Sequence, residues 1–178
     1  MTDRHVDVIQ TAVGHLPINT PMLYGTFFIQ VERRTPGFPE YGTVEHYRSP
    51  NTVVLTGLSM LARWISSYGY GANSQMAYIA VGTATTAGSV NQTNLAGEVK
   101  RKAFSSVSVT TNNSWSAVTT FGGGADGLTN VVIGEASVWN AAGSGSGVMF
   151  NRAPLSSTFT LQNSDIAAIQ GIVSVGSL

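Results

Sequence analysis

Apolar and polar residues alternate along most of the chain after position 75, a pattern typical of strands that bury one face. It predicts strands over 76–81, 98–110, 114–121, 131–139, 148–153, 158–161 and 166–175. Clusters of Gly, Asn and Ser separate these runs, and such residues tolerate the positive φ angles of tight turns. The spacing predicts about seven antiparallel strands in a β-sandwich or flattened barrel.

Before these strands, apolar residues recur with the period of a helix, and this pattern predicts one helix over 49–67. Ser49 suits an N-cap and Pro50 the first helical position. Apolar residues then recur every three or four positions, and Gly69 and Gly71 end the pattern. These apolar residues are Val54, Leu58, Leu61 and Ile65. We expect this helix to cover one face or end of the sheet.

The first 50 residues hold five of the six prolines, which interrupt long regular elements. They are also rich in aromatic residues, in which disordered segments are poor. We therefore predict an extended, partner-binding N-terminal arm at 1–48, with one strand near 24–31, and a β-sandwich body at 49–178. The arm lies along its own body or along a neighbouring subunit, and we favour the neighbour, so that deletion of 1–48 leaves a folded body. The residues expected to make this assembly contact are Leu23, Tyr24, Phe27, Phe28, Phe38 and Tyr41.

Charge is scarce: only 10% of the residues are charged, against ~25% in an average soluble domain. Nine acidic and nine basic residues cancel, which disfavours nucleic-acid binding and favours self-association into a homo-oligomer. A trimer or a higher oligomer is compatible with this. The absence of cysteine excludes disulfides and thiolate metal sites. No apolar run reaches ~18 residues and no leader peptide is visible, so we expect no membrane contact.

The candidate chemical motifs favour plain structural interpretations. The glycine-rich run at 122–127 lacks the Lys-Ser/Thr and the helix that a phosphate loop requires. The GSGSG letters at 143–147 match a nucleophile elbow but lie in a low-complexity loop. His5, His15 and His46 do not have the short spacings of metal ligands. We therefore predict no catalytic residue, no metal and no cofactor.

Four spaced segments remain: AVGT at 80–83, TNLAGEVKR at 93–101, GEASVW at 134–139 and GVMFNR at 147–152. In this order they resemble the small β-rich domain of tailed-bacteriophage structural proteins. In particular, they resemble the N-terminal docking domain of tail-collar fibre proteins and short virion proteins related to it. The resemblance covers about 52–175 and implies a non-enzymatic virion component made in the cytoplasm of a bacterial host. It implies docking onto other virion proteins in the tail, neck, baseplate or fibre attachment.

In the resembling domains, acidic and basic residues recur at fixed positions of this pattern. Here those positions are occupied by Glu98, Arg101, Glu135 and Arg152. We predict that Arg101 or Arg152 forks onto one of the glutamates and ties neighbouring strands together. Two partly buried carboxylates can also hydrolyse glycosides. We favour the ion pair, because no set of aromatic and polar residues that would line a cleft can be assigned.

Two further functions stay open. No fibre shaft repeats follow the final predicted strand, so we also expect that the chain could be a capsid (head) decoration or cement protein. A glycan-binding module for a host surface would need exposed aromatic residues. Outside the arm these are Trp115, Trp139, Tyr68 and Tyr70, and the two tryptophans lie on predicted strands, where a core position is expected.

Overall fold

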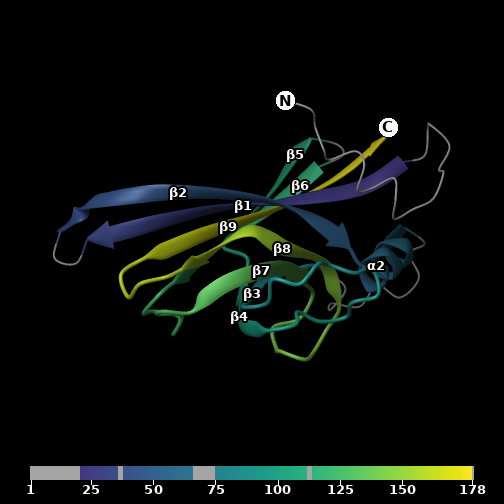
Figure 1. Ribbon diagram of the computed structural model, residues 1–178. Coiled ribbons are helices and arrows are strands. Elements are labelled where there is room, and N and C mark those ends of the chain that lie inside the picture. The colour runs from purple at the N-terminus through teal and green to yellow at the C-terminus, as the bar shows by residue number, and fades with distance from the viewer. Residues whose placement is uncertain (1–20, 36–37, 66–74, 112–113, 178) are drawn as a thin grey trace.

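The computed structural model describes residues 21–35, 38–65, 75–111 and 114–177. In this part of the chain, nine antiparallel strands form a curled half-barrel sheet with one short helix (Figure 1). The sheet order is β4-β3-β7-β8-β2-β1-β9-β6-β5. The elements are β1 (Pro21–Thr35), β2 (Phe38–Val53), α2 (Leu55–Ile65), β3 (Tyr78–Gly82), β4 (Glu98–Ala103), β5 (Ser106–Thr111), β6 (Ser114–Gly122), β7 (Val132–Trp139), β8 (Met149–Thr160) and β9 (Ile166–Ser177).

The two edge strands of the sheet, β4 and β5, follow each other directly in the chain. Only Phe104 and Ser105 separate them. The Phe104 amide donates to the Ala77 carbonyl beside β3, whereas the Ser105 amide donates to the Val118 carbonyl on β6. The sheet therefore curls until the end of one edge meets the start of the other. The single strand expected over 98–110 is divided at this point.

The β1–β2 hairpin lies in the middle of the sheet and corrects the expected arm. β1 pairs with β9 in register from Pro21↔Ser177 to Glu32↔Ile166. Phe27, Ile29 and Val31 on this strand are at most 2% exposed and belong to the core.

The boundary at residue 48 therefore does not separate an arm from a body, and deletion of 1–48 would remove β1 and most of β2, the two central strands. The prolines misled the prediction because Pro21 starts β1 and Pro39 lies near the hairpin connection, where few ladder hydrogen bonds are lost. Residues 1–20 lie outside the described part of the chain.

The helix begins at Leu55 and not at Ser49, because Ser49 and Pro50 still belong to β2. Its buried face also differs from the expected stripe. Met60 is 7% exposed and packs on the core, while Leu58 is 41% exposed. Gly57 sets this orientation, since a β-carbon at this position would collide with the Phe150 carbonyl of β8. The helix can approach the sheet closely only on its glycine face.

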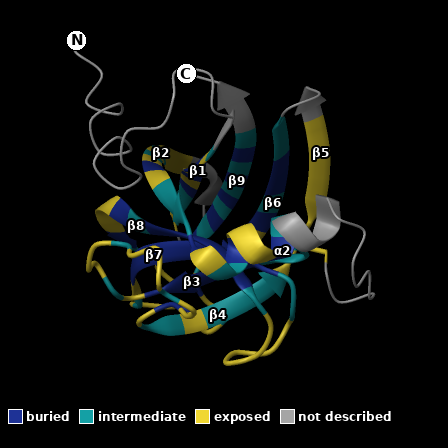
Figure 2. Ribbon diagram, turned by 90° about the vertical axis from the view of Figure 1, so that its right-hand side faces the viewer, coloured by how far each residue is buried: buried dark blue, intermediate teal, exposed yellow. Residues whose placement is uncertain are grey.

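The main core fills the concave side of the curled sheet, where buried residues of six strands (β1, β3, β6, β7, β8 and β9) and the helix meet (Figure 2). A smaller cluster lies where β3, β7 and β8 meet the loops, around the fully buried Trp139. The strand count differs from the expected seven for three reasons. The hairpin adds β1 and β2, the edge strands divide one predicted strand, and β8 joins the predicted strands at 148–153 and 158–161.

Candidate assembly surface and polar clusters

The four sequence segments that carry the phage resemblance meet at one buried place, which we call the Glu135 cluster: Gly82, Gly97, Glu135 and Arg152. Arg152 Nε lies 2.6 Å from Glu135 Oε2, and both side chains are 0% exposed. The Gly97 amide donates to Glu135 Oε1 at 2.8 Å. A β-carbon at Gly82 would lie 2.5 Å from that same oxygen, so only glycine leaves room for the carboxylate.

Arg152 also anchors the long loop between β3 and β4. Its Nη1 donates to the Ala87 carbonyl at 3.1 Å and to Gln92 Oε1 at 2.9 Å. Its Nη2 donates to Thr86 Oγ1 at 3.3 Å. All three nitrogens of the guanidinium are thus bound within the chain. The Glu135 cluster ties β7 and β8 to this loop, which is a structural role.

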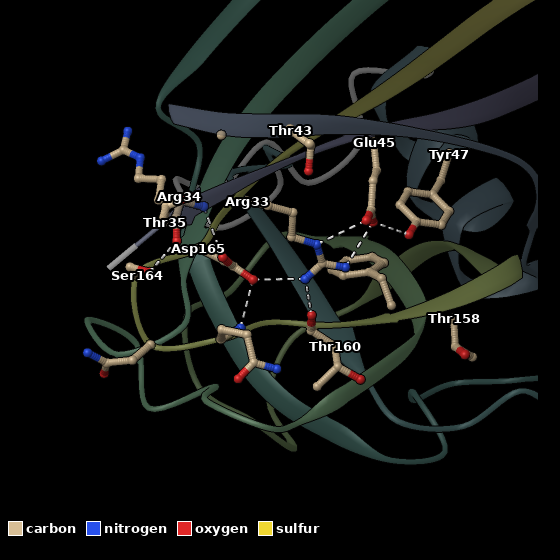
Figure 3. A pocket seen from close by; sticks show the side chains of 14 residues that line it. Arg33, Arg34, Thr35, Thr43, Glu45, Tyr47, Thr158, Thr160, Ser164 and Asp165 are labelled. Carbon is tan, nitrogen blue, oxygen red and sulfur yellow. Dashed lines mark hydrogen bonds and ion pairs between the residues drawn. The ribbon is translucent and has the colours of Figure 1, made fainter. Parts of the chain in front are cut away.

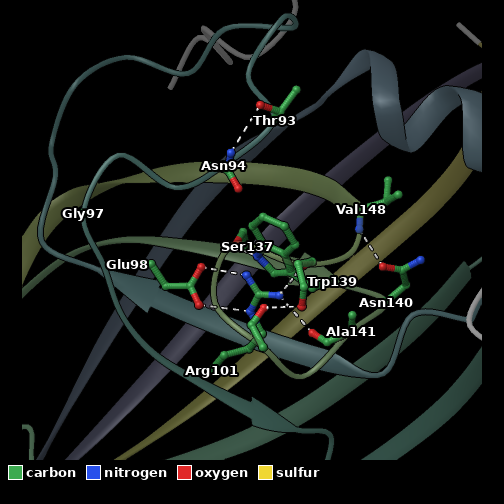
Figure 4. A network of polar contacts seen from close by, with 12 residues as sticks. Thr93, Asn94, Gly97, Glu98, Arg101, Ser137, Trp139, Asn140, Ala141 and Val148 are labelled. Carbon is green, nitrogen blue, oxygen red and sulfur yellow. Dashed lines mark hydrogen bonds and ion pairs between the residues drawn. The ribbon is translucent and has the colours of Figure 1, made fainter.

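Glu98 and Arg101 form a second ion pair within β4 (Figure 4). Arg101 forks onto the carboxylate with Nη2–Oε2 and Nε–Oε1 distances of 2.7 and 3.0 Å. The guanidinium carbon lies 3.7 Å from the centroid of the Trp139 ring, a cation–π contact, and Nη1 donates to the Ala141 carbonyl. Arg101 therefore forks onto a glutamate of its own strand, whereas Arg152 contacts Glu135 through Nε alone and joins two strands by that ion pair.

A third polar cluster surrounds Arg33, beside a hollow of about 1190 Å³ under the β1–β2 hairpin (Figure 3). Arg33 lies 2.8 Å from Glu45 Oε2 and 2.8 Å from Asp165 Oδ2, and it also donates to the Thr160 carbonyl. The Tyr47 hydroxyl donates to Glu45 at 2.6 Å. The sequence analysis missed this cluster. Arg33 lies 132 positions from Asp165, and no local spacing signals a contact over that distance.

The ionisation of this cluster follows from its contacts. The hydrogen bond from Arg33, with that from Tyr47, lowers the pKa of Glu45. Burial favours the neutral form of Asp165, but hydrogen bonds from the Gln162 amide and Arg33 outweigh it and lower the pKa. Burial, and then the bond to Glu45, raises the pKa of Tyr47. The Arg33 guanidinium therefore helps to hold both carboxylates ionised, and it fastens the hairpin to β8 and to the loop before β9.

The predicted assembly residues divide between the two faces of β1. Tyr24 and Phe28 point to the outer face and are 42% and 39% exposed. Phe27 is 0% exposed and Leu23 is partly buried against the core, so their assignment to a partner contact is corrected. The alternation of a strand separates these neighbours. The side chains of Phe38 and Tyr41 lie outside the described residues.

The outer face around Tyr24 and Phe28 carries little charge. β9 lies next to β1 in the sheet and β6 lies next to β9, and the outward side chains of these two strands have no ionisable group. These side chains are Ala168, Gln170, Ile172 and Ser174 on β9, and Ser116, Val118 and Thr120 on β6. The Arg48 guanidinium lies 5.4 Å from the centre of the Phe28 ring, on the β2 side.

The other motifs form ordinary structure. At 122–127, the Gly122 amide donates to Asp126 Oδ2 within the run and the Gly124 amide donates to the Asn163 carbonyl, so this run is a turn bonded to itself and to the loop before β9. Among the described residues, no three His, Asp or Glu side chains gather closely enough to hold a metal. His46 is exposed on β2, while His5 and His15 lie outside the described residues. No helix in the described ranges is long and apolar enough to cross a membrane.

No protein-family model, curated protein or solved structure matches this chain. Its function is therefore inferred from its own residues and their geometry.

Proposed function

We propose that this chain is a non-enzymatic structural component of a tailed-phage virion. It self-associates and docks onto neighbouring virion proteins, at the tail, neck, baseplate or fibre attachment. A position on the head, as a decoration protein, is the alternative within the same class. The observation that carries the proposal is the outer face of β1, where Tyr24 and Phe28 project into solvent from a central strand.

Exposed aromatic residues on the outer face of a sheet favour a protein interface. Aromatic side chains bury a large area with few rotatable bonds, and they are enriched among the residues that dominate binding energy. The outward residues of β9 and β6 lack charge, so little desolvation of ions opposes contact there. The buried arginines at 101 and 152 are bound within the chain. Docking would therefore rest on apolar and backbone contacts.

Immunogold electron microscopy of purified virions, with an antibody against this chain, tests the proposal. Label confined to the tail, neck or baseplate would support the docking function. Label distributed over the head would make the chain a decoration protein. A virion preparation without label in either place would refute a virion function altogether.

A surface variant tests the face itself. Phage carrying Tyr24→Lys together with Phe28→Lys should incorporate much less of the chain, because two lysines would have to be desolvated in the interface. Val132→Lys is the matched control, since Val132 is 45% exposed on β7, in the other half of the sheet. Quantitative blotting of purified particles measures incorporation. Equal incorporation of both variants would remove this face from the interface.

Glycan binding is the second candidate, and the hollow beside Arg33 favours it. Hydroxyl and amide side chains line much of this hollow, together with Tyr47. Trp139 is 0% exposed and Trp115 packs against Phe104, so neither tryptophan offers an open ring. Tyr68 and Tyr70 lie outside the described residues. A glycan array probed with the parent and with Thr158→Trp, which narrows the hollow, would support this function only if the parent binds and the variant does not.

A further inference from the structure

Among the described residues, one side of β5 has no neighbouring strand and its apolar face is exposed. β5 is the last strand at one edge of the sheet, so within the described residues it pairs with β6 alone. Val107 and Val109 lie opposite Ala117 and Trp115, on the concave face that forms the core. They are nevertheless 60% and 75% exposed, and β5 appears as an exposed strand at the sheet margin in Figure 2.

β5 lacks the features that usually protect an edge strand. Natural edges carry charges or prolines that block pairing with another chain. Ser106–Thr111 contains neither. The opposite edge, β4, is protected in this way, because Lys100 and Lys102 lie there and bind Asp126 at 3.9 and 2.8 Å. An unprotected strand with a free ladder and exposed valines fits an edge that another strand covers.

We propose that β5 pairs antiparallel with β5 of a second copy of this chain, across a two-fold axis at Ser108. In this register Val107 lies opposite Val109 of the second copy, and Ser108 lies opposite its equivalent. β-Branched residues pair well across antiparallel strands. Both valines of each copy also lie on the concave side, so the apolar face continues from one subunit into the other.

Charge distinguishes this pairing from the other edge contacts. Pairing of β4 with a second β4, centred on Arg101, would place Lys100 opposite Lys102 of the other copy, and like charges directly opposite are destabilising. Pairing of β4 with β5 would bury lysines against valines, since β5 offers no carboxylate. The β5–β5 contact brings no charges together. It is also isologous, so it closes as a dimer and leaves no second β5 edge for growth.

This inference deepens the proposed assembly function by naming one contact between copies. Its test uses the purified full-length chain, whereas the proposed function is tested on virions, so either can fail without the other. Sedimentation equilibrium of the parent should show a concentration-dependent dimer. Val109→Lys should raise the dissociation constant at least tenfold, while the control Val132→Lys, on the other half of the sheet, should leave it unchanged.

Two cysteine variants test the register, and the chain contains no other cysteine. Paired residues in antiparallel strands have Cα atoms about 4.5–5.5 Å apart, within the range that a disulfide spans. Ser108→Cys should therefore form a covalent dimer under mild oxidation. Ser106→Cys should not, because its equivalents would lie more than about 13 Å apart in this register. A parent that stays monomeric, a dimer insensitive to Val109→Lys, or crosslinking of Ser106→Cys as fast as Ser108→Cys would overturn the proposal.

Discussion

Replacing Glu135 by Gln changes almost no volume but removes the negative charge that faces Arg152. Glu135 accepts hydrogen bonds from Arg152 Nε at 2.6 Å, the Gly97 amide at 2.8 Å and the Ala96 amide at 3.4 Å. A glutamine has one acceptor oxygen, so its NH₂ group must face at least one of these donors. The variant therefore leaves a buried donor unsatisfied and a guanidinium without its counter-charge.

The magnitude follows from the burial of the pair. Both side chains are 0% exposed, so water cannot replace the lost carboxylate. Breaking a buried ion pair by removing one partner costs about 3–5 kcal/mol. For a chain of this length each kcal/mol lowers the melting temperature by about 2–4 °C, so Glu135→Gln should lower it by about 6–20 °C.

Urea unfolding followed by tryptophan fluorescence measures this loss, because Trp139 is buried in the folded chain. Glu32→Gln is the matched control. Glu32 pairs with Arg34 on the surface, where both side chains are more than a third exposed and a pair contributes about 1 kcal/mol or less.

The double variant Glu135→Gln/Arg152→Met removes both buried charges and should cost less than the sum of its single substitutions. A Glu135→Gln loss no larger than that of Glu32→Gln would refute the assignment of this pair as a main structural contact.

Three further predictions test the rest of the structure. Gly82→Ala should lower the free energy of unfolding by about 1–3 kcal/mol in the same urea assay, because the added methyl group displaces the carboxylate beneath it. Asp165 and Glu45 have pKa values below their ordinary 3.8 and 4.5, so the unfolded chain binds more protons in acid and stability is lost as the pH falls below those values. Urea midpoints measured from pH 7 to 3 should show this loss, and Asp165→Asn should make the midpoint depend less steeply on pH. An unchanged dependence would show that Asp165 does not contribute to the loss. Phe27→Ala should cost about 3–5 kcal/mol and Phe28→Ala about 1 kcal/mol or less, since the first side chain is 0% and the second 39% exposed; similar losses would contradict the assigned faces.

The expected strands agree best with the structure where the alternating pattern is long and uninterrupted. The strands predicted over 114–121, 131–139 and 166–175 correspond closely to β6, β7 and β9. The mainly β class followed from the same local period, because alternation places side chains on opposite faces whichever strands become neighbours. The four residues of the two arginine–glutamate pairs were also predicted from the sequence, since all four lie in the spaced motifs.

The high proline content caused the sequence interpretation to predict an arm where the structure has the β1–β2 hairpin. Val31 and its apolar neighbours on β1 alternate like any core strand, but the prolines around them favoured an arm. The hairpin is central because it pairs with β9, which lies more than a hundred positions later in the chain. No local pattern specifies that pairing.

The sequence by itself determined the elements whose signal is local: the alternating strands, a helix before them, the turns, and a surface poor in charge. Only the tertiary structure decided which strands are neighbours, where the edges lie and which face of the helix is buried. It placed Arg33 against Asp165 and brought Gly82 beneath Glu135. It also left Val109 on an open edge. The physical reason is that hydrogen-bonded ladders and buried charges join residues far apart in the chain, and their partners exist only once the sheet has curled.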